Sequence, residues 1–141
     1  MVGSNAEYKG LLRLSSVMRD LVFRVGTQEP GPVGVTRELL DLAREASCGE
    51  CTPCRLGTTR MLELVDGVLR GRGAAGGDDL LGQLADTAGM VGASSGCHLG
   101  RVIGRLVARS VEHHRFEYEA HARGERLGIG GANARAGATA V

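Results

Sequence analysis

The chain has 141 residues, and its 17 basic side chains nearly balance 16 acidic ones, for a formal net charge of +1. This balance excludes a strongly cationic nucleic-acid binder or a polybasic membrane anchor, and the length allows one domain plus an appendage. Hydrophobic residues make up 43% of the chain but aromatic residues only 3%, so the core must be aliphatic and modest, and such a core often needs a covalent or metal staple.

The region before the first cysteine predicts two helices separated by a breaker cluster. Residues 8–25 carry apolar side chains at three- and four-residue steps, which is typical of an amphipathic helix, although residues 21–23 could equally begin a strand. Residues 26–34 contain two prolines and predict a linker. A second helix is predicted to start near Thr36, whose hydroxyl would cap it. Residues 1–34 are therefore expected to be an N-terminal extension that either docks a partner or packs on the rest of the chain.

Three more helices are predicted after the first cysteines. The first begins at Pro53, whose missing N–H costs nothing in a first turn, and stops at the glycine-rich residues 71–77. The next begins at Asp78 or Asp79 and stops at a loop over residues 89–96. The last begins near Leu99 and continues toward His121.

Helices with short connections indicate an all-α fold, a small four-helix bundle over residues 35–122 that carries the cysteine loop. Residues 123–141 are rich in Gly and Ala and are expected to form a disordered, flexible tail. We expect a cytoplasmic location because no signal sequence and no apolar run of membrane-spanning length is found. Thiols stay reduced there, so the cysteines are expected to be ligands or catalytic groups rather than disulfides.

The cysteines form a pattern with specific chemistry. Cys48, Cys51 and Cys54 are separated by two residues each, and Cys97 follows at a distance. Three thiolates at this spacing can each reach a different iron of a cubane cluster, and a remote fourth cysteine ligates the last iron. Zinc sites usually take cysteines in pairs, and a third at the same spacing crowds one side of a single ion. We therefore expect these four cysteines to bind one [4Fe–4S] cluster, with a structural zinc-binding adaptor module as the alternative.

The residues around the cysteines favour a negatively charged cluster. Cys54 lies in the first turn of one predicted helix and Cys97 directly precedes another, so two helix N-termini would point their N–H groups at one place. Arg55 adds a positive charge, and Gly49 allows the loop to fold tightly. His98 is expected to lie beside the site without ligating the metal. No nucleophile and base are found at a useful spacing, so no catalytic residue is predicted.

Two segments carry a family resemblance. Ser-Cys-Gly-Glu-Cys-Thr-Pro-Cys-Arg-Leu-Gly at residues 47–57 and Ser-Gly-Cys-His-Leu-Gly at residues 95–100 closely resemble the iron–sulfur domain of the NADH-oxidising flavoprotein subunit of respiratory complex I. Related domains occur in NAD-reducing hydrogenases and NAD-dependent formate dehydrogenases. The resemblance covers about residues 36–122 and implies a four-helix bundle with one [4Fe–4S] cluster, which accepts single electrons from reduced FMN. It implies no FMN or NAD site in this chain, which lacks the glycine-rich loop of the flavin domain.

These observations predict an electron-transfer subunit of a multi-subunit oxidoreductase of the NADH dehydrogenase, hydrogenase or formate dehydrogenase type. Whether the chain is an enzyme by itself stays open, since the chemistry on a substrate would occur on another subunit. The expected partners are redox subunits that contain flavin or iron–sulfur centres, in a complex that could lie at the inner face of a membrane. No nucleic-acid partner and no membrane span are expected. A redox-inert cluster that only staples the fold is a further alternative.

Overall fold

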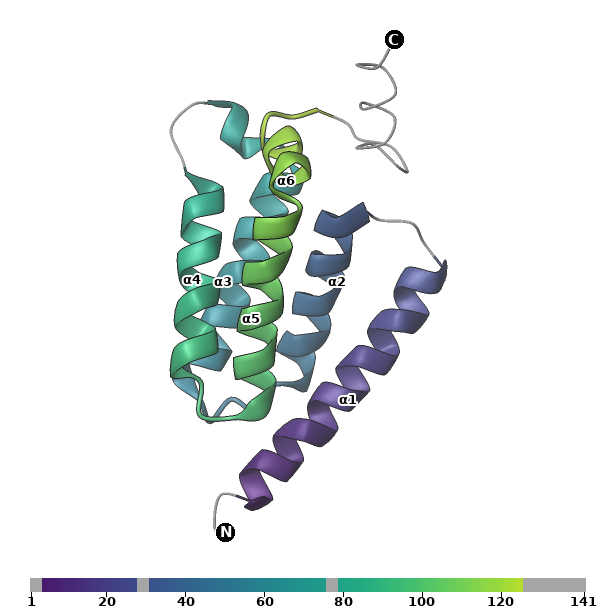
Figure 1. The fold of residues 1–141 in the computed structure, drawn as a ribbon, viewed down its shortest axis with the longest axis vertical. Helices are drawn as coiled ribbons and strands as arrows, with labels where there is room; N and C mark the ends of the chain where they lie inside the picture. The colour runs from purple at the N-terminus through teal and green to yellow at the C-terminus, as the bar shows by residue number, and fades with distance from the viewer. Residues whose placement is uncertain (1–3, 28–30, 76–78, 126–141) are drawn as a thin grey trace.

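The computed structural model describes residues 4–27, 31–75 and 79–125, and within these ranges the chain is helical with no β-strand (Figure 1). The elements are α1 (Ser4–Thr27), α2 (Gly31–Ala46), α3 (Thr52–Leu69), the short 3₁₀ helix η1 (Arg72–Ala75), α4 (Leu80–Ser94), α5 (His98–His113) and α6 (Arg115–Ala122). Helices α2 to α5 form the bundle, α6 lies at one end of it, and α1 lies obliquely along its side. The prediction of an all-α four-helix bundle is confirmed.

An aliphatic core fills the space between these helices. The largest side chains that are essentially inaccessible to solvent come from all the bundle helices and α6; they include Leu40, Met61, Leu84, Leu99, Ile103 and Tyr118. The apolar positions repeat at helical spacing, so each helix turns one continuous stripe toward its neighbours. The core therefore holds the four helices together without the aromatic residues that the chain lacks.

Helix α2 begins earlier than the sequence predicts. It starts at Gly31, which has a positive φ of 70°, and Pro32 occupies its first turn, where a proline is well tolerated. Thr36 lies inside the helix and its hydroxyl donates to the Pro32 carbonyl at 3.0 Å. The prediction that Thr36 caps the helix is therefore wrong. The predicted linker is also wrong over most of its length, and only residues 28–30 lie outside the described residues.

Two glycine-containing segments that were predicted as loops contain helix. Helix α4 runs to Ser94 and includes Gly89 and Gly92, and η1 occupies part of residues 71–77. Gly92 of α4 and Gly104 of α5 lie where these helices cross. A Cβ at Gly104 would lie 2.7 Å from the Ala88 carbonyl oxygen and from the Gly92 Cα. Glycine is used here for a close approach of two backbones rather than for a helix stop.

The C-terminal helix is interrupted where the sequence predicts continuity. His114 adopts φ −116° and ψ 28°, between α5 and α6. The Tyr118 backbone N–H still donates to the His114 carbonyl, at 3.2 Å, so the chain turns without losing all helical hydrogen bonds. The turn places the Tyr118 side chain in the core, where it is fully buried. The predicted flexible tail lies outside the described residues from residue 126 onward.

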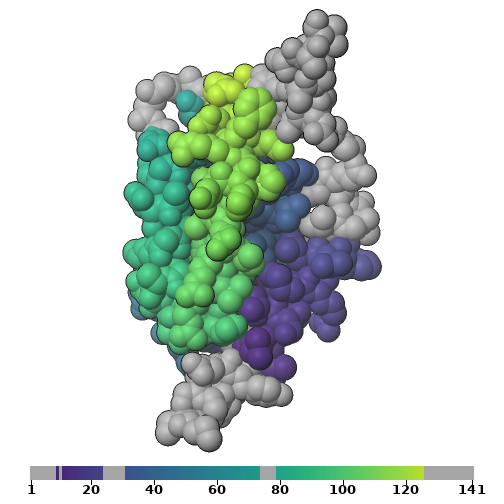
Figure 2. Space-filling model, viewed as in Figure 1, coloured from purple at the N-terminus to yellow at the C-terminus, as the bar shows by residue number. Residues whose placement is uncertain are grey.

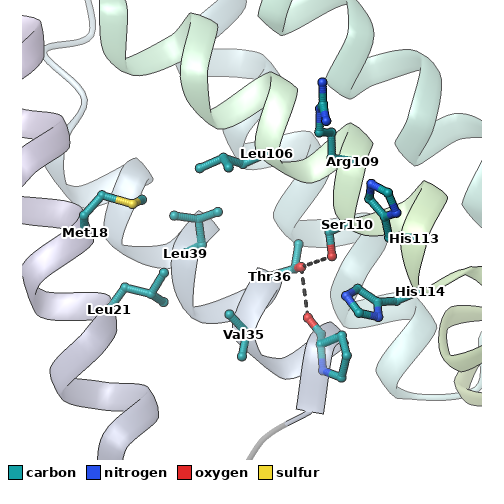
Figure 3. Close-up of a pocket in the computed structure, with 11 residues that line it drawn as sticks. Met18, Leu21, Val35, Thr36, Leu39, Leu106, Arg109, Ser110, His113 and His114 are labelled. Carbon is teal, nitrogen blue, oxygen red and sulfur yellow. Dashed lines mark hydrogen bonds between the residues drawn. The ribbon is translucent and has the colours of Figure 1, made fainter. Parts of the chain in front are cut away.

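Tyr118 joins three helices through a buried network of hydroxyls. Its OH donates to Thr36 Oγ1 of α2 at 2.7 Å and lies 2.9 Å from Ser110 Oγ of α5. The Thr36 and Ser110 oxygens are 2.8 Å apart, as Figure 3 shows. Burial raises the pKa of Tyr118 above its ordinary value, because the ionised form would lose contact with water. The network therefore requires the neutral phenol.

We expect Tyr118→Phe to lower the free energy of unfolding by about 1–2 kcal/mol, because the other two hydroxyls lose a partner in the core. The loss should shrink above about pH 10, where tyrosine ionises in the unfolded chain but not in the folded one, and so destabilises only the wild type. Urea unfolding at pH 8 and pH 10.5 measures both effects. Thr59→Ala is the control, because the Thr59 hydroxyl is exposed and bonds only to Arg55 of its own helix. Equal stability of wild type and Tyr118→Phe at pH 8 would contradict the role of the network.

Helix α1 packs on α2 and α5 but leaves apolar side chains exposed (Figure 2). Leu14 and Val17 are buried, whereas Leu11 and Leu12 are about half exposed and Val22 and Phe23 are 72% and 74% exposed. A cavity of about 560 Å³ lies between α1, α2 and α5, with apolar walls that come from all three helices (Figure 3). Residues 21–23 are helical, so the alternative of a strand is wrong.

The membrane-span criterion gives a plain result. Over the part of the chain that the structure describes, none of the helices combines the length and the apolar character needed to cross a bilayer.

Candidate metal centre

The two cysteine-bearing loops meet at one end of the bundle, the lower end in Figure 1. One loop connects α2 to α3 and the other connects α4 to α5. Cys51 is the N-cap residue of α3, and Cys97 is the N-cap residue of α5. The backbone N–H of Gly96 donates to Cys51 Sγ at 3.2 Å, so the loops are in direct contact. The prediction that two helix N-termini converge beside the cysteines is confirmed.

The first loop is shaped by local turn chemistry. Gly49 has a φ of 77°, a conformation that other residues rarely adopt, and its N–H donates to Ser47 Oγ at 3.3 Å. Pro53 lies in the first turn of α3, and the Arg55 N–H donates to the Cys51 carbonyl at 2.9 Å. The helix therefore begins directly after Cys51, which brings Cys54 around to its buried face.

The second loop is short because one helix ends and the next begins within it. Ser95 is the C-cap residue of α4, and its N–H donates to the Val91 carbonyl at 3.1 Å. Cys97 Sγ accepts a hydrogen bond from the Gly100 N–H at 3.5 Å, which caps α5 with a sulfur atom. Sulfur is thus the acceptor for a free N–H at the helix N-terminus, a position where negative charge is stabilised.

The cysteines differ in exposure. Cys48 is exposed, Cys51 and Cys97 are partly buried, and Cys54 is buried. Burial raises the pKa of the Cys54 thiol, and the nearby Cys97 and Cys51 raise it further through charge repulsion. Ser47 Oγ lies 3.8 Å from Cys54 Sγ and opposes part of this rise. The mutual repulsion shows that three of the thiols face a common region.

Cys51 has the opposite balance. Its burial alone would raise the pKa, but hydrogen bonds from the Cys54, Gly96 and Cys97 N–H groups and from the Ser95 side chain outweigh burial and lower it. The backbone donors come from both cysteine-bearing loops. The loops are therefore arranged to stabilise negative charge on sulfur, as a thiolate ligand of a metal requires.

The donor set fits an iron–sulfur cluster. Thiolates are the usual ligands of such clusters, and N–H groups directed at sulfur offset the negative charge of the bound group. Among the described residues, no three His, Cys, Asp or Glu side chains converge closely enough to hold a single metal ion. The cysteine region thus offers sulfur ligands and N–H donors at two helix N-termini.

The other predicted residues have mixed placements. Gly49 takes the positive φ that a tight loop needs, as expected. Arg55 is exposed, and His98 is the partly buried first residue of α5. Sequence reasoning overlooked Ser95 and Gly100, which pack against the cysteines. A signal for Ser95 was present, because a polar residue just before a capping cysteine is placed to turn into the same site.

The comparisons with known proteins agree with this geometry. Residues 34–121 match the family described as the NADH-ubiquinone oxidoreductase-F iron-sulfur binding region. The chain belongs to this family.

Curated relatives come from two kinds of complex. The chain is 29% identical over 115 residues to the NADP-reducing hydrogenase subunit HndC of Solidesulfovibrio fructosivorans, which covers 82% of this chain and 23% of the relative. It is 29% identical over 118 residues to the F subunit of the NADH-quinone oxidoreductase of Mycobacterium tuberculosis, which covers 84% and 26%. It is 36% identical over 78 residues to the corresponding protein of Streptomyces coelicolor, which covers 55% and 17%. The chain thus spans about a quarter or less of the length of these relatives.

Proposed function

We propose that Cys48, Cys51, Cys54 and Cys97 bind one [4Fe–4S] cluster and that the chain relays single electrons between redox subunits of an oxidoreductase. The observation that carries the proposal is the hydrogen bond from the Gly96 N–H to Cys51 Sγ, which joins the two cysteine-bearing loops at two helix N-termini. Membership of the iron–sulfur binding family supports it.

The protein's contribution is to hold charge in a fixed place. A bound cluster of this type takes up and returns one electron at a time. The N–H groups of Gly96 and Gly100, which already donate to sulfur, stabilise the additional negative charge of the reduced state. Cys54 lies on the core side, where burial limits the access of water, and Cys48 lies on the solvent side. Electrons would therefore pass most directly at the Cys48 edge.

The flavin and nicotinamide chemistry belongs to other parts of the complex in this proposal. We infer that residues 35–122 form a cluster-binding domain and that this chain itself binds neither FMN nor NAD. Fluorescence titration of the purified chain with FMN and with NADH tests this inference. Saturable binding at micromolar concentration would contradict it. The cytoplasmic location stays a prediction.

Helix α1 is the proposed docking element for another component of the oxidoreductase. The support is the exposure of Val22 and Phe23 beside a cavity with apolar walls, in a chain whose relatives are subunits of larger complexes. Phe23→Ser should reduce co-purification of a flavin- or iron–sulfur-containing subunit at least tenfold, with Met90→Ser on α4 as the exposed apolar control. Retention of that subunit by Phe23→Ser, or self-association through α1 in its place, would contradict this assignment.

A redox titration followed by electron paramagnetic resonance tests the central proposal. Anaerobically purified protein should be brown and bleach with dithionite, and the reduced form should give the signal of a one-electron-reduced [4Fe–4S] cluster. A colourless protein with one zinc ion would support the adaptor alternative. A cluster that cannot be reduced at physiological potentials would support a purely structural role. Either result would overturn the proposal.

A further inference from the structure

Ser95 carries a buried hydroxyl with no role in the fold. The residue is 5% exposed, and Ser95 Oγ has no hydrogen-bond partner of normal geometry within the described residues. Its backbone N–H already bonds to Val91, so the side chain is not needed to end α4. A buried hydroxyl without a partner costs free energy, and such groups are kept where a ligand supplies the partner.

The surroundings of Ser95 direct this hydroxyl toward the cysteines. A Cβ at Gly100 would lie 2.6 Å from Ser95 Cβ and 3.1 Å from Cys54 Cβ, so Ser95 occupies space between the first turn of α5 and Cys54. The Ser95 side chain is also close enough to Cys51 to help lower the pKa of that thiol. Gly100 thus leaves room for a hydroxyl between two cysteines from the other loop.

We propose that the Ser95 hydroxyl donates a hydrogen bond to the sulfur of Cys51 when that sulfur ligates the cluster, and that it raises the reduction potential of the cluster. This inference rests on the proposed function. Ser95 is a positioning residue for charge, since it touches a ligand sulfur. Ser47 differs from it, because the Ser47 hydroxyl also accepts from the Gly49 N–H and so has a role in the loop.

The direction of the effect follows from charge. Reduction adds one negative charge to the cluster and its thiolates, and a donor hydrogen bond stabilises the more negative state more strongly. Removing the donor therefore lowers the potential. We expect Ser95→Ala to change the ratio of oxidised to reduced cluster by about tenfold at the wild-type midpoint, which is about 59 mV for a one-electron couple.

The test is a redox titration of anaerobically prepared full-length wild type, Ser95→Ala and Ser94→Ala. Ser94 is the matched control, because it is the adjacent serine and is exposed at the end of α4. Iron and acid-labile sulfide should be equal in all three proteins, and only Ser95→Ala should have a lower midpoint. In D₂O, electron–nuclear double resonance should show one exchangeable deuteron coupling fewer in Ser95→Ala. A merely structural serine would not remove that coupling.

The outcomes separate this inference from the proposed function. If wild type contains the cluster but Ser95→Ala keeps the same midpoint and deuteron couplings, the assignment to Ser95 is wrong and the electron-transfer proposal stands. If wild type contains no cluster, the proposed function fails first. If Ser95→Ala loses iron, Ser95→Thr, which keeps the hydroxyl, must restore both iron content and midpoint; failure of this rescue would overturn the assignment.

Discussion

Replacement of Cys97 by serine is expected to remove one ligand without unfolding the bundle. Iron should fall from about four per chain to about three or fewer, and the signal of the reduced [4Fe–4S] cluster should disappear. The reason is positional, since Cys97 is the thiol at the N-terminus of α5 and faces the thiols of the other loop. Electron transfer through the assembled complex should fall at least a hundredfold. Iron analysis and paramagnetic resonance of anaerobic protein measure the first two effects.

Serine at position 97 keeps the capping interaction that the cysteine makes. Its hydroxyl can accept the hydrogen bond that the Gly100 N–H now donates to sulfur, so α5 should still begin at the same residue. Circular dichroism should therefore show unchanged helicity. Ser94→Ala, in the same segment, should keep full iron content. A Cys97→Ser variant with four irons and normal electron transfer would show that Cys97 is not a ligand.

The second large effect is expected at the crossing of α4 and α5. Gly104→Ala should lower the free energy of unfolding by about 2–3 kcal/mol, since the new methyl group would press on backbone atoms of Ala88 and Gly92 that cannot rotate away. The helices would have to separate, and the loop between them carries Cys97. Urea unfolding of the metal-free chain measures the change. The prediction concerns packing, so it does not depend on the cluster.

Gly89→Ala is the matched control for this prediction. Gly89 lies in the same helix, α4, but a Cβ at this position would meet nothing within 4 Å. Alanine is the better helix former, so Gly89→Ala should stabilise the protein by about 0.5–1 kcal/mol. Opposite signs at the two glycines are the expected result. A stabilising Gly104→Ala would mean that α4 and α5 do not cross this closely.

The sequence was sufficient to predict the helices that show a clear apolar stripe. Leu99, Ile103 and Val107 recur at helical spacing and are all buried, so α5 was predictable. Asp79 was recognised as a helix start because its side chain can cap, and it accepts from the Gly82 N–H at 2.9 Å. Local signals therefore indicate elements whose ends depend on local chemistry.

Features set by tertiary contacts could not be predicted in this way. Gly92 is typical of a loop when only its neighbours in sequence are considered, but it lies in a helix because Gly104 packs beside it. Thr36 has the composition of a cap, but its hydroxyl faces Ser110 and Tyr118, more than 70 residues away in sequence. The buried Ser95 hydroxyl belongs to the same class, since its significance depends on a cysteine from another loop.

The candidate ligands were predictable from spacing, and the convergence of the two helix N-termini followed from their positions beside Cys54 and Cys97. The differences between the thiols required the structure. Burial of Cys54 and the N–H donors around Cys51 change their pKa values in opposite directions, although both residues lie in one short loop. Sequence spacing contains no information about such burial.

The central claim is that the two cysteine-bearing loops together hold an iron–sulfur cluster. Quantification of iron, acid-labile sulfide and zinc in the full chain, purified without oxygen, tests it most directly. We predict about four irons and about four sulfides per chain, with negligible zinc. Protein that is free of iron and sulfide under these conditions would contradict the claim.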